Sequence, residues 1–269
     1  MADLSDFFRG FQLPTMPEVA QALVRTLNEH DVPVAKIRDL ISKDPALTVR
    51  VLRLANSARF GLKRQVASLD DAIMLVGLAQ VRTLALSCCL NDAFPVVGGL
   101  DRGEFWRQSM ACAGYAQWLT TNIGGDRHEA WLAGFMVRLG ELVIATALPG
   151  CMAEIEQLPH YPGSRWQREC NFLGFSEGEV TAELARRWQF PREIVRGLTH
   201  AANPLEARPF SRLGAIVHIA QLLAEMPAEH PEVIEELPQD ILDTLLVDRE
   251  WMRNNMPAYT TLVDTSVLN

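Results

Sequence analysis

Signals for the start of an α-helix recur along this chain, whereas signals for β-strands do not. Asp44 stands before a proline, which is tolerated at the first helical position because an N–H there has no partner within the helix. Ser176 and Glu179 have the spacing of a capping box, in which each side chain accepts a hydrogen bond from the other residue's backbone N–H. Thr15 and Ser164 are also expected to cap helices. No stretch shows sustained alternation of apolar and polar residues, and no Asn-Gly or Asp-Gly pair marks a hairpin, so the sequence predicts an all-α fold.

The composition is typical of a globular protein in the cytoplasm. Hydrophobic residues make up 48% of the chain and charged residues 22%, and the formal net charge is −8. An acidic chain argues against nucleic acid as the main partner, because phosphates are usually bound by a basic face. The N-terminal residues do not form a secretory signal, and the apolar runs are shorter than the roughly 18 residues that span a bilayer. Five cysteines without C-x-x-C spacing are expected to be free thiols. We therefore expect a cytoplasmic protein without membrane contact.

Residues 94–103 contain the clearest internal boundary, because Pro95, Gly98, Gly99 and Gly103 are unfavourable inside a helix. This boundary predicts an N-terminal lobe of about five helices, followed by a larger helical lobe. The expected segments are a tail over residues 1–12, a domain over 13–208 whose first lobe spans about 13–95 and whose second lobe begins near 101, and C-terminal helices over 209–269 that pack on the second lobe.

The helix that follows the Asp-Pro pair is apolar over most of its circumference, so other helices must nearly surround it. Its polar stripe holds Arg50, Arg53 and Ser57, whereas Asn56 on the other side is expected to bond a backbone group. A rigid helix can present two arginines with little loss of entropy on binding. These four residues are therefore a candidate surface for an acidic protein partner.

Charge is unevenly distributed along the chain. Residues 36–64 hold eight basic and two acidic residues, and residues 225–250 hold nine acidic residues and one arginine. The two segments are either solvated faces or interaction surfaces. In the second case Arg50 and Arg53 either dock a partner or pair with the acidic segment and close one lobe on the other.

Several blocks of sequence, taken in order, carry a family resemblance. They are LPTMPEVAQALVRTLNE, LISKDPALTVRVLRLANSARFG, VASLDDAIMLVGLAQVRTLAL, FWRQSMACAGYAQWL, AGFMVRLGELV, LGFSEGEVTAELARRWQFPREIVRGLTH and VHIAQLLAE. The chain resembles the HDOD family, the HD-related output domains of bacterial signalling proteins, well over residues 13 to about 208 and weakly beyond. The resemblance implies a two-lobed helical fold derived from the HD hydrolase scaffold. It also implies a place in signal transduction, often beside cyclic-di-GMP or two-component modules, with no catalysis or an undetermined activity.

The segment GFMVRLGE is similar to the metal-binding helix of HD phosphohydrolases, whose pattern is Gly-x-x-His-Asp-x-Gly-Lys. Val137 and Arg138 stand at the positions of the His-Asp pair. By the same resemblance, Gln108 and Gln221 take the positions of the first histidine and the distant aspartate. Valine has no lone pair for a metal, arginine repels one, and glutamine is a poor ligand for a transition metal. We therefore expect a degenerate HD-type lobe with no metal, no cofactor and no catalytic residue.

Arg138 and His200 are the candidate ligand-binding residues. Arg138 places a guanidinium where the family has an acidic ligand. It forms an ion pair with Glu141 or another carboxylate, or it makes the old pocket a site for phosphate or carboxylate. His200 matches the first of two adjacent histidines in many relatives, with Ala201 in place of the second. The alternative for His200 is a capped or surface histidine.

These patterns predict a non-catalytic signal-transduction protein that acts through protein contacts. A nucleotide or another small anion is a candidate ligand of the vestigial HD pocket. The first alternative is a metal-dependent phosphohydrolase with non-standard ligands. The second is a DNA-binding regulator that uses DDAIMLVGLAQVRTLAL as two helices around a glycine turn. Val81, Leu84 and Leu86 make the second of these helices too apolar to read a groove.

Overall fold

The computed structural model describes residues 4–263, with gaps at 12, 30, 58–60, 62–63, 95–99, 160, 162 and 227–230. Within these ranges every regular element is a helix, which confirms the expected all-α fold. The proline and two of the glycines on which the internal boundary depends lie outside the described residues, and the third glycine, Gly103, lies in the first turn of a helix rather than outside it. The helices are α1 (Leu4–Arg9), α2 (Glu18–Leu27), α3 (Val34–Ser42), α4 (Pro45–Ala55), α5 (Leu69–Val76), α6 (Leu78–Ala93), α7 (Arg102–Ile123), α8 (Arg127–Met136), α9 (Leu139–Ala147), α10 (Cys151–Glu156), α11 (Ser164–Leu173), α12 (Glu177–Arg187), α13 (Arg192–Thr199), α14 (Arg212–Glu225), α15 (Gln239–Leu245) and α16 (Arg249–Asn255), with short 3-10 turns η2 (Pro204–Glu206), η3 (Pro231–Glu236) and η4 (Tyr259–Thr261).

Two of the expected helix caps are formed. Asp44 Oδ1 accepts hydrogen bonds from the backbone N–H groups of Ala46 and Leu47, at 2.9 and 3.0 Å, where α4 begins. Ser176 and Glu179 form the capping box at the start of α12, with Ser176 N 2.8 Å from Glu179 Oε2. These side chains satisfy N–H groups that have no partner inside the helix.

The other two expected caps are wrong. α2 begins at Glu18 with Pro17 in the cap position and no capping side chain, so Thr15 lies too early in the chain. Ser164 is the first residue of α11 rather than its cap, and its hydroxyl bonds the backbone N and O of Tyr161, at 2.9 and 2.6 Å. In both cases a proline or a glycine precedes the helix and sets the backbone turn that starts it.

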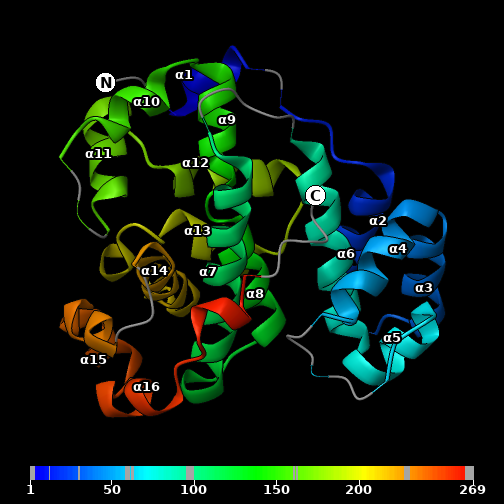
Figure 1. Ribbon diagram of the computed structural model, residues 1–269. Helices are drawn as coiled ribbons and strands as arrows, with labels where there is room; N and C mark the ends of the chain where they lie inside the picture. Colours follow the sequence, from blue (N-terminus) through cyan, green and yellow to red (C-terminus); the bar gives the residue numbers. More distant parts are fainter. Residues whose placement is uncertain are drawn as a thin grey trace.

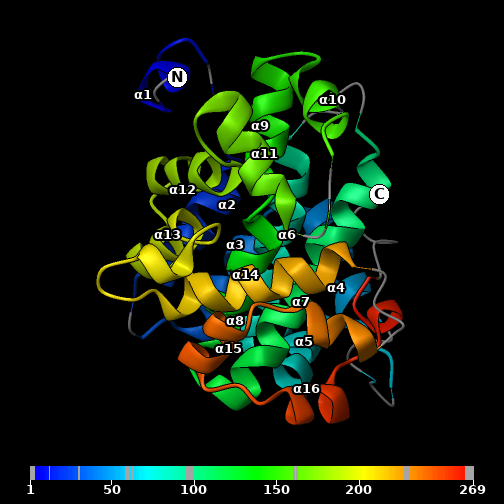
Figure 2. The same ribbon diagram turned by 90° about the vertical axis from the view of Figure 1, so that its left-hand side faces the viewer.

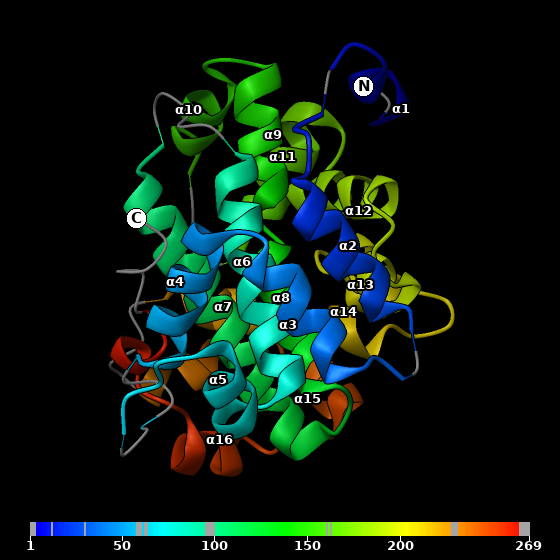
Figure 3. The ribbon, with the colours of Figure 1, turned by 90° about the vertical axis from the view of Figure 1, so that its right-hand side faces the viewer.

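The helices form two groups that meet where α6 contacts α8. In the first group α6 packs against α2, α3, α4 and α5. These helices occupy the blue-to-cyan side of Figure 1 and face the viewer in Figure 3. In the second group α7 packs along α8 and α14, and Figure 2 shows α14 crossing in front of α7. This arrangement confirms the expected two-lobed helical fold.

The first helix is docked on the protein, although we expected residues 1–12 to form a tail. Phe8 is buried, and the Phe7 ring lies 5.2 Å from the ring of Phe175. The Arg187 guanidinium lies 4.7 Å from the centre of the Phe8 ring. Burying one phenylalanine contributes about 1.5–3 kcal/mol, so apolar contact explains why this short helix has a fixed position.

One described segment, Arg127–Ala147, is long and apolar enough to cross a membrane by length and composition. It comprises α8, α9 and the turn between them, and 89% of its most apolar window is buried inside the protein. The expectation that every apolar run is too short for a bilayer is therefore too strict. The segment's apolar side chains pack against other helices of the same chain. A helix in the core of a protein can therefore also be long and apolar enough to cross a membrane.

Candidate functional site

The positions equivalent to the HD pair lie at a break between two helices. α8 ends at Met136 and α9 begins at Leu139, so Val137 and Arg138 form the turn between them. The hydroxyl of Thr181, on α12, accepts a hydrogen bond from Gly140 N at 2.7 Å and donates one to the carbonyl of Val137 at 2.9 Å. One side chain therefore satisfies two backbone groups that the break leaves without helical partners.

The two glycines that frame the break allow other chain segments to approach closely. A Cβ at Gly134 would lie 2.9 Å from the backbone oxygen of Cys112, on α7. A Cβ at Gly140 would overlap the backbone oxygen of Glu177, at the start of α12. Both glycines are therefore required by helix packing, independently of any metal chemistry.

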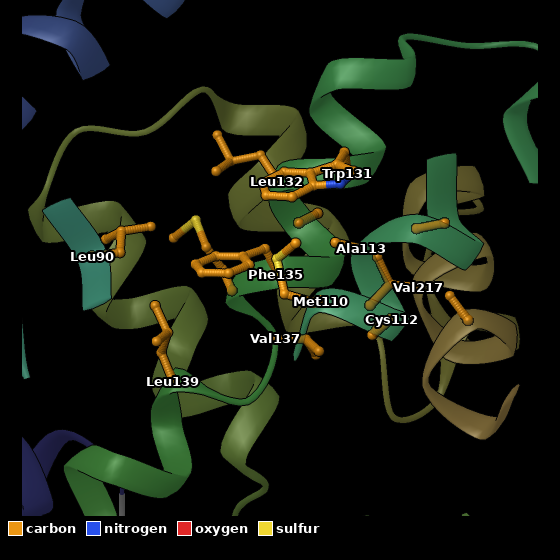
Figure 4. Close-up of a cluster of buried hydrophobic side chains, with 14 of the residues drawn as sticks. Leu90, Met110, Cys112, Ala113, Trp131, Leu132, Phe135, Val137, Leu139 and Val217 are labelled. Carbon is orange, nitrogen blue, oxygen red and sulfur yellow. The ribbon is translucent and has the colours of Figure 1, made fainter. Parts of the chain in front are cut away.

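Val137 belongs to the hydrophobic core. Its side chain is fully buried and lies in the cluster that includes Met110, Phe135 and Leu139, drawn in Figure 4. An isopropyl group in this place contributes packing and offers no atom that could bind a ligand. Val137 therefore stabilises the break without taking part in a polar site.

Arg138 and Gln108, which the resemblance places at two ligand positions, are in direct contact. The Arg138 side chain is 5% exposed and donates one hydrogen bond to Gln108 Oε1 and another to Glu141 Oε2, the latter at 2.6 Å. Its guanidinium also lies 5.3 Å from the centre of the Phe105 ring, a distance at which cation–π attraction operates. The ion pair with Glu141, one of the two readings of Arg138, is therefore formed.

The network continues from Glu141 to three further charged groups. Glu141 Oε1 lies 2.7 Å from Arg165 Nη2, and Arg165 Nε lies 3.2 Å from Glu169 and 3.3 Å from Glu177. Glu169 also accepts a hydrogen bond from the Glu177 backbone N at 2.7 Å. Two arginines and three glutamates from α9, α11, α12 and the helix break thus share one buried cluster, which we call the Arg138 network.

The three glutamates of this network differ in the direction of their pKa shifts. Burial raises the pKa of Glu141, but the positive charges of Arg138 and Arg165 outweigh it and hold that pKa below its usual value. Burial raises the pKa of Glu169 to about 7. Burial and the Glu169 charge raise the pKa of Glu177 well above its usual value. The Glu177 carboxyl is fully buried, and its one ion-pair contact among the described residues is Arg165 Nε at 3.3 Å, so burial outweighs the attraction of that cation for the ionised form.

Gln221 is buried on α14 but is not part of the Arg138 network. Its Nε2 donates to Glu225 Oε1 at 3.1 Å, and Glu225 Oε2 accepts from the backbone N of Gly163 at 3.0 Å. Within the described ranges no hydrogen bond or ion pair connects Gln221 to Arg138. Gln221 therefore fixes the segment before α11 against α14.

His200 also lies in a different place from Arg138. It is the half-buried C-cap residue of α13 and lines a cavity of about 630 Å³ together with Arg186, Arg192 and Arg196. Our sequence reasoning did not single out these arginines. The signal was present, because residues 186–212 contain six arginines and two glutamates in an acidic chain.

The candidate partner surface on α4 divides into internal and exposed residues. Arg50 forms a two-bonded ion pair with Asp92 on α6, so its ion pair among the described residues is with α6 and not with the acidic segment 225–250. Asn56 bonds the backbone N and O of Val66, at 2.7 and 2.8 Å, which confirms its expected backbone contact but gives it a structural role.

Two residues of that surface remain accessible to a partner. Arg53 is exposed and has no ion-pair partner among the described residues, and Ser57 is half-buried. In the acidic segment, Glu235 pairs with Arg253 at 2.5 Å. Among the described residues, no group of three or more His, Cys, Asp or Glu side chains is arranged to hold a metal ion.

The glycine-framed break between α8 and α9, packed against α7, α12 and α14, defines a helical scaffold of the HD type. The family model for the HDOD domain matches residues 13–204, and the chain belongs to the HDOD family.

Individual relatives agree with this family. A solved structure from Shewanella amazonensis SB2B, described as a "Putative phosphohydrolase", is similar with a TM-score of 0.79 and 26% identity over 99% of this chain and 97% of its own. A structure of an HDOD domain protein with unknown function from Geobacter sulfurreducens has a TM-score of 0.80 and 22% identity, over 98% and 95% of the two chains, and shows the shared fold. An uncharacterized protein from Treponema pallidum is 26% identical over 88% of this chain, which spans about half, 47%, of that relative's length.

Proposed function

We propose that the chain is a signal-transduction protein of the cytoplasm that works through protein contacts and not through catalysis. One observation carries the proposal: the Arg138 guanidinium is buried and bonded to Gln108 and Glu141, at the place where the family resemblance puts metal ligands. Hydrolysis of the HD type needs a divalent metal that activates water. Arg138 offers only N–H donors and a fixed positive charge at this place.

The carboxylates of the Arg138 network support the same conclusion. Glu141 lies 2.6 Å from Arg138 and 2.7 Å from Arg165, so a metal ion would have to displace a guanidinium to reach it. A displaced guanidinium would remain buried without its partner, which costs several kcal/mol. The network is thus better suited to holding helices together than to binding a metal.

The catalytic alternative is tested by metal content and hydrolysis together. Protein purified without chelator is assayed for iron, manganese and zinc by elemental analysis, and for hydrolysis of bis(4-nitrophenyl) phosphate with added manganese. We expect substoichiometric metal and no turnover above the buffer rate. Stoichiometric metal together with phosphodiesterase activity would mean that the chain is a phosphohydrolase with ligands at other positions.

The protein-contact half of the proposal is tested on α4. Proteins that bind the wild type in extract of the native cell are compared with those that bind Arg53→Gln and Arg127→Gln. Both arginines are exposed and both variants lose one charge, but Arg127 lies on α8. A partner that is retained by Arg127→Gln and lost by Arg53→Gln would support docking on α4. Equal binding by all three proteins would reject α4 as the docking surface.

Nucleic acid is disfavoured as the partner by the position of α6. This helix is the second of the pair that the DNA-binding alternative requires, and it packs against α2, α3, α4, α5 and α8. Val81, Leu84 and Leu86 are buried in the core. A recognition helix needs a free face that reaches the base edges, and α6 has none to offer without unfolding of the lobe.

A further inference from the structure

The cavity beside His200 is strongly basic. Its lining residues come from the end of α12, from the turn that follows and from α13. These two helices pack against each other at the outer edge of the second helix group in Figure 2. The volume of the cavity is about 630 Å³. Three arginines, a histidine, a threonine and two apolar residues form its wall: Arg186, Arg192, Arg196, His200, Thr199, Phe190 and Val195.

The positive charge of this cavity is only partly neutralised within the protein. Arg192 has no hydrogen-bond or ion-pair partner among the described residues. Arg196 donates to the backbone carbonyl of Pro209, which carries no net charge. Arg186 bonds Glu183 twice, at 2.7 Å each, but Glu183 is shared with Arg187. The cavity therefore presents an excess of guanidinium charge to the solvent.

Helix stability does not account for this arrangement. Arg192 and Arg196 lie four residues apart on one side of α13, where their like charges repel, and His200 at the C-cap continues the same side. Arg192 is also the first residue of α13, where the helix dipole favours an anion over a cation. The N-terminus of α13 has no capping side chain, so its first N–H groups are free of side-chain partners. A bound anion would relieve the repulsion between the two arginines and the unfavourable position of Arg192 at the positive end of the helix dipole.

The chemistry and size of the cavity indicate the class of ligand. Guanidinium groups bind phosphate through paired, charge-assisted hydrogen bonds. A volume of about 630 Å³ is within the range of small-molecule sites and much larger than inorganic phosphate needs. Phe190 and Val195 provide an apolar wall for an organic part of the ligand. We propose that this cavity binds a phosphorylated small molecule of nucleoside monophosphate size, a site separate from the Arg138 network and independent of the function proposed above.

The experiment is calorimetric titration of the full chain with adenosine monophosphate, guanosine monophosphate, inorganic phosphate, uncharged adenosine and a phosphoserine peptide. The variants are Arg192→Gln and Arg196→Gln, and Arg127→Gln is the control with the same loss of charge outside the cavity. We expect at least one nucleotide to bind more tightly than adenosine and than inorganic phosphate. Each cavity variant should weaken that binding about tenfold or more, because a charge-assisted hydrogen bond contributes roughly that factor.

Every other result overturns the proposal. Absence of binding by the nucleotides at millimolar concentration removes it. Equal weakening by Arg127→Gln means that only the net charge matters. Binding of a phosphoserine peptide without binding of either nucleotide assigns the cavity to a protein partner instead. Equal melting temperatures of the variants and the wild type ensure that lost binding is not lost folding. The metal and hydrolysis assays do not depend on this outcome.

Discussion

The guanidinium of Arg138 lies 2.6 Å from the carboxylate of Glu141, and both side chains are almost completely buried, at 5% and 2% exposure. Their neighbours Gln108 and Arg165 complete the polar contacts of the pair. A buried ion pair stabilises a fold weakly compared with apolar packing, but removal of one partner is costly because the other charge remains in the core. This asymmetry yields the first prediction.

We expect Arg138→Met to lower the free energy of unfolding by about 3 kcal/mol or more, because Glu141 keeps only Arg165 as its cation. The double variant Arg138→Met/Glu141→Leu should lose less than the single variant, since no buried carboxylate is left that has lost one of its two cations. Urea unfolding of the two single variants and the double variant measures this coupling. A single variant within about 0.5 kcal/mol of the wild type would show that the pair has no energetic role.

Two buried carboxyl groups should make the protein less stable as the pH rises towards neutral. Burial raises the pKa of Glu169 to about 7, and burial with the Glu169 charge raises the pKa of Glu177 well above its usual value. A carboxyl group with a higher pKa in the folded state holds its proton more tightly there. The contribution of such a carboxyl group to the free energy of unfolding therefore falls as the pH rises from the unfolded pKa of about 4.3 to the folded pKa. The fall is at most about 1.4 kcal/mol per pH unit for each group.

The comparison of wild type with Glu177→Gln isolates this effect. Burial lowers the pKa of His128 and His218, so these histidines affect stability in the opposite sense. The protein loses their contribution to the free energy of unfolding as the pH falls below about 6.5. These histidines are present in both proteins and cancel in the difference. Urea unfolding at about pH 5, 6 and 7 should show the wild type losing stability relative to Glu177→Gln. A difference independent of pH would contradict the protonated state of Glu177.

The hydroxyl of Thr181 should contribute more to the stability of the fold than the volume of its side chain does. Thr181→Val keeps the shape but leaves the N–H of Gly140 and the carbonyl of Val137 without their partner. Each buried unsatisfied group costs about 1–3 kcal/mol, so we expect a loss of at least that size. Thr181→Ser keeps the hydroxyl and is the matched control. Similar melting temperatures for the valine and serine variants would mean that the two hydrogen bonds do not hold the α8–α9 break.

Features set by short stretches of sequence could be predicted. The Asp44 cap depends on residues within one helical turn, and the backbone contact of Asn56 follows from its place on an otherwise apolar side of α4. The prediction failed at Thr15 and Ser164, where an adjacent proline or glycine determines the start of the helix. Local side-chain patterns therefore have to be weighed against the backbone preferences of their neighbours.

Features that depend on contacts between distant segments could not be predicted. Glu141 follows Arg138 by three residues, so their pairing was one of two readings, but nothing local indicates that Arg165 and Glu177 join them. The excess of arginine in residues 186–212 is visible in the sequence. Only the packing of α12 on α13 gathers part of it around a cavity.

Arg50 and Arg53 lie three residues apart on α4, and the structure predicts different effects of their removal. Arg50 bridges α4 to α6 through Asp92, with 21% and 41% of the two side chains exposed. A partly exposed pair contributes little, so Arg50→Gln should lower the free energy of unfolding by about 0.5–1 kcal/mol. Arg53 is exposed without an ion pair, so Arg53→Gln should stay within about 0.5 kcal/mol of the wild type. Urea unfolding of both variants and the wild type measures this difference in the free energy of unfolding. Equal free energies of unfolding for the two variants would mean that the Arg50–Asp92 ion pair contributes nothing measurable. Arg50 would then remain a candidate docking residue beside Arg53.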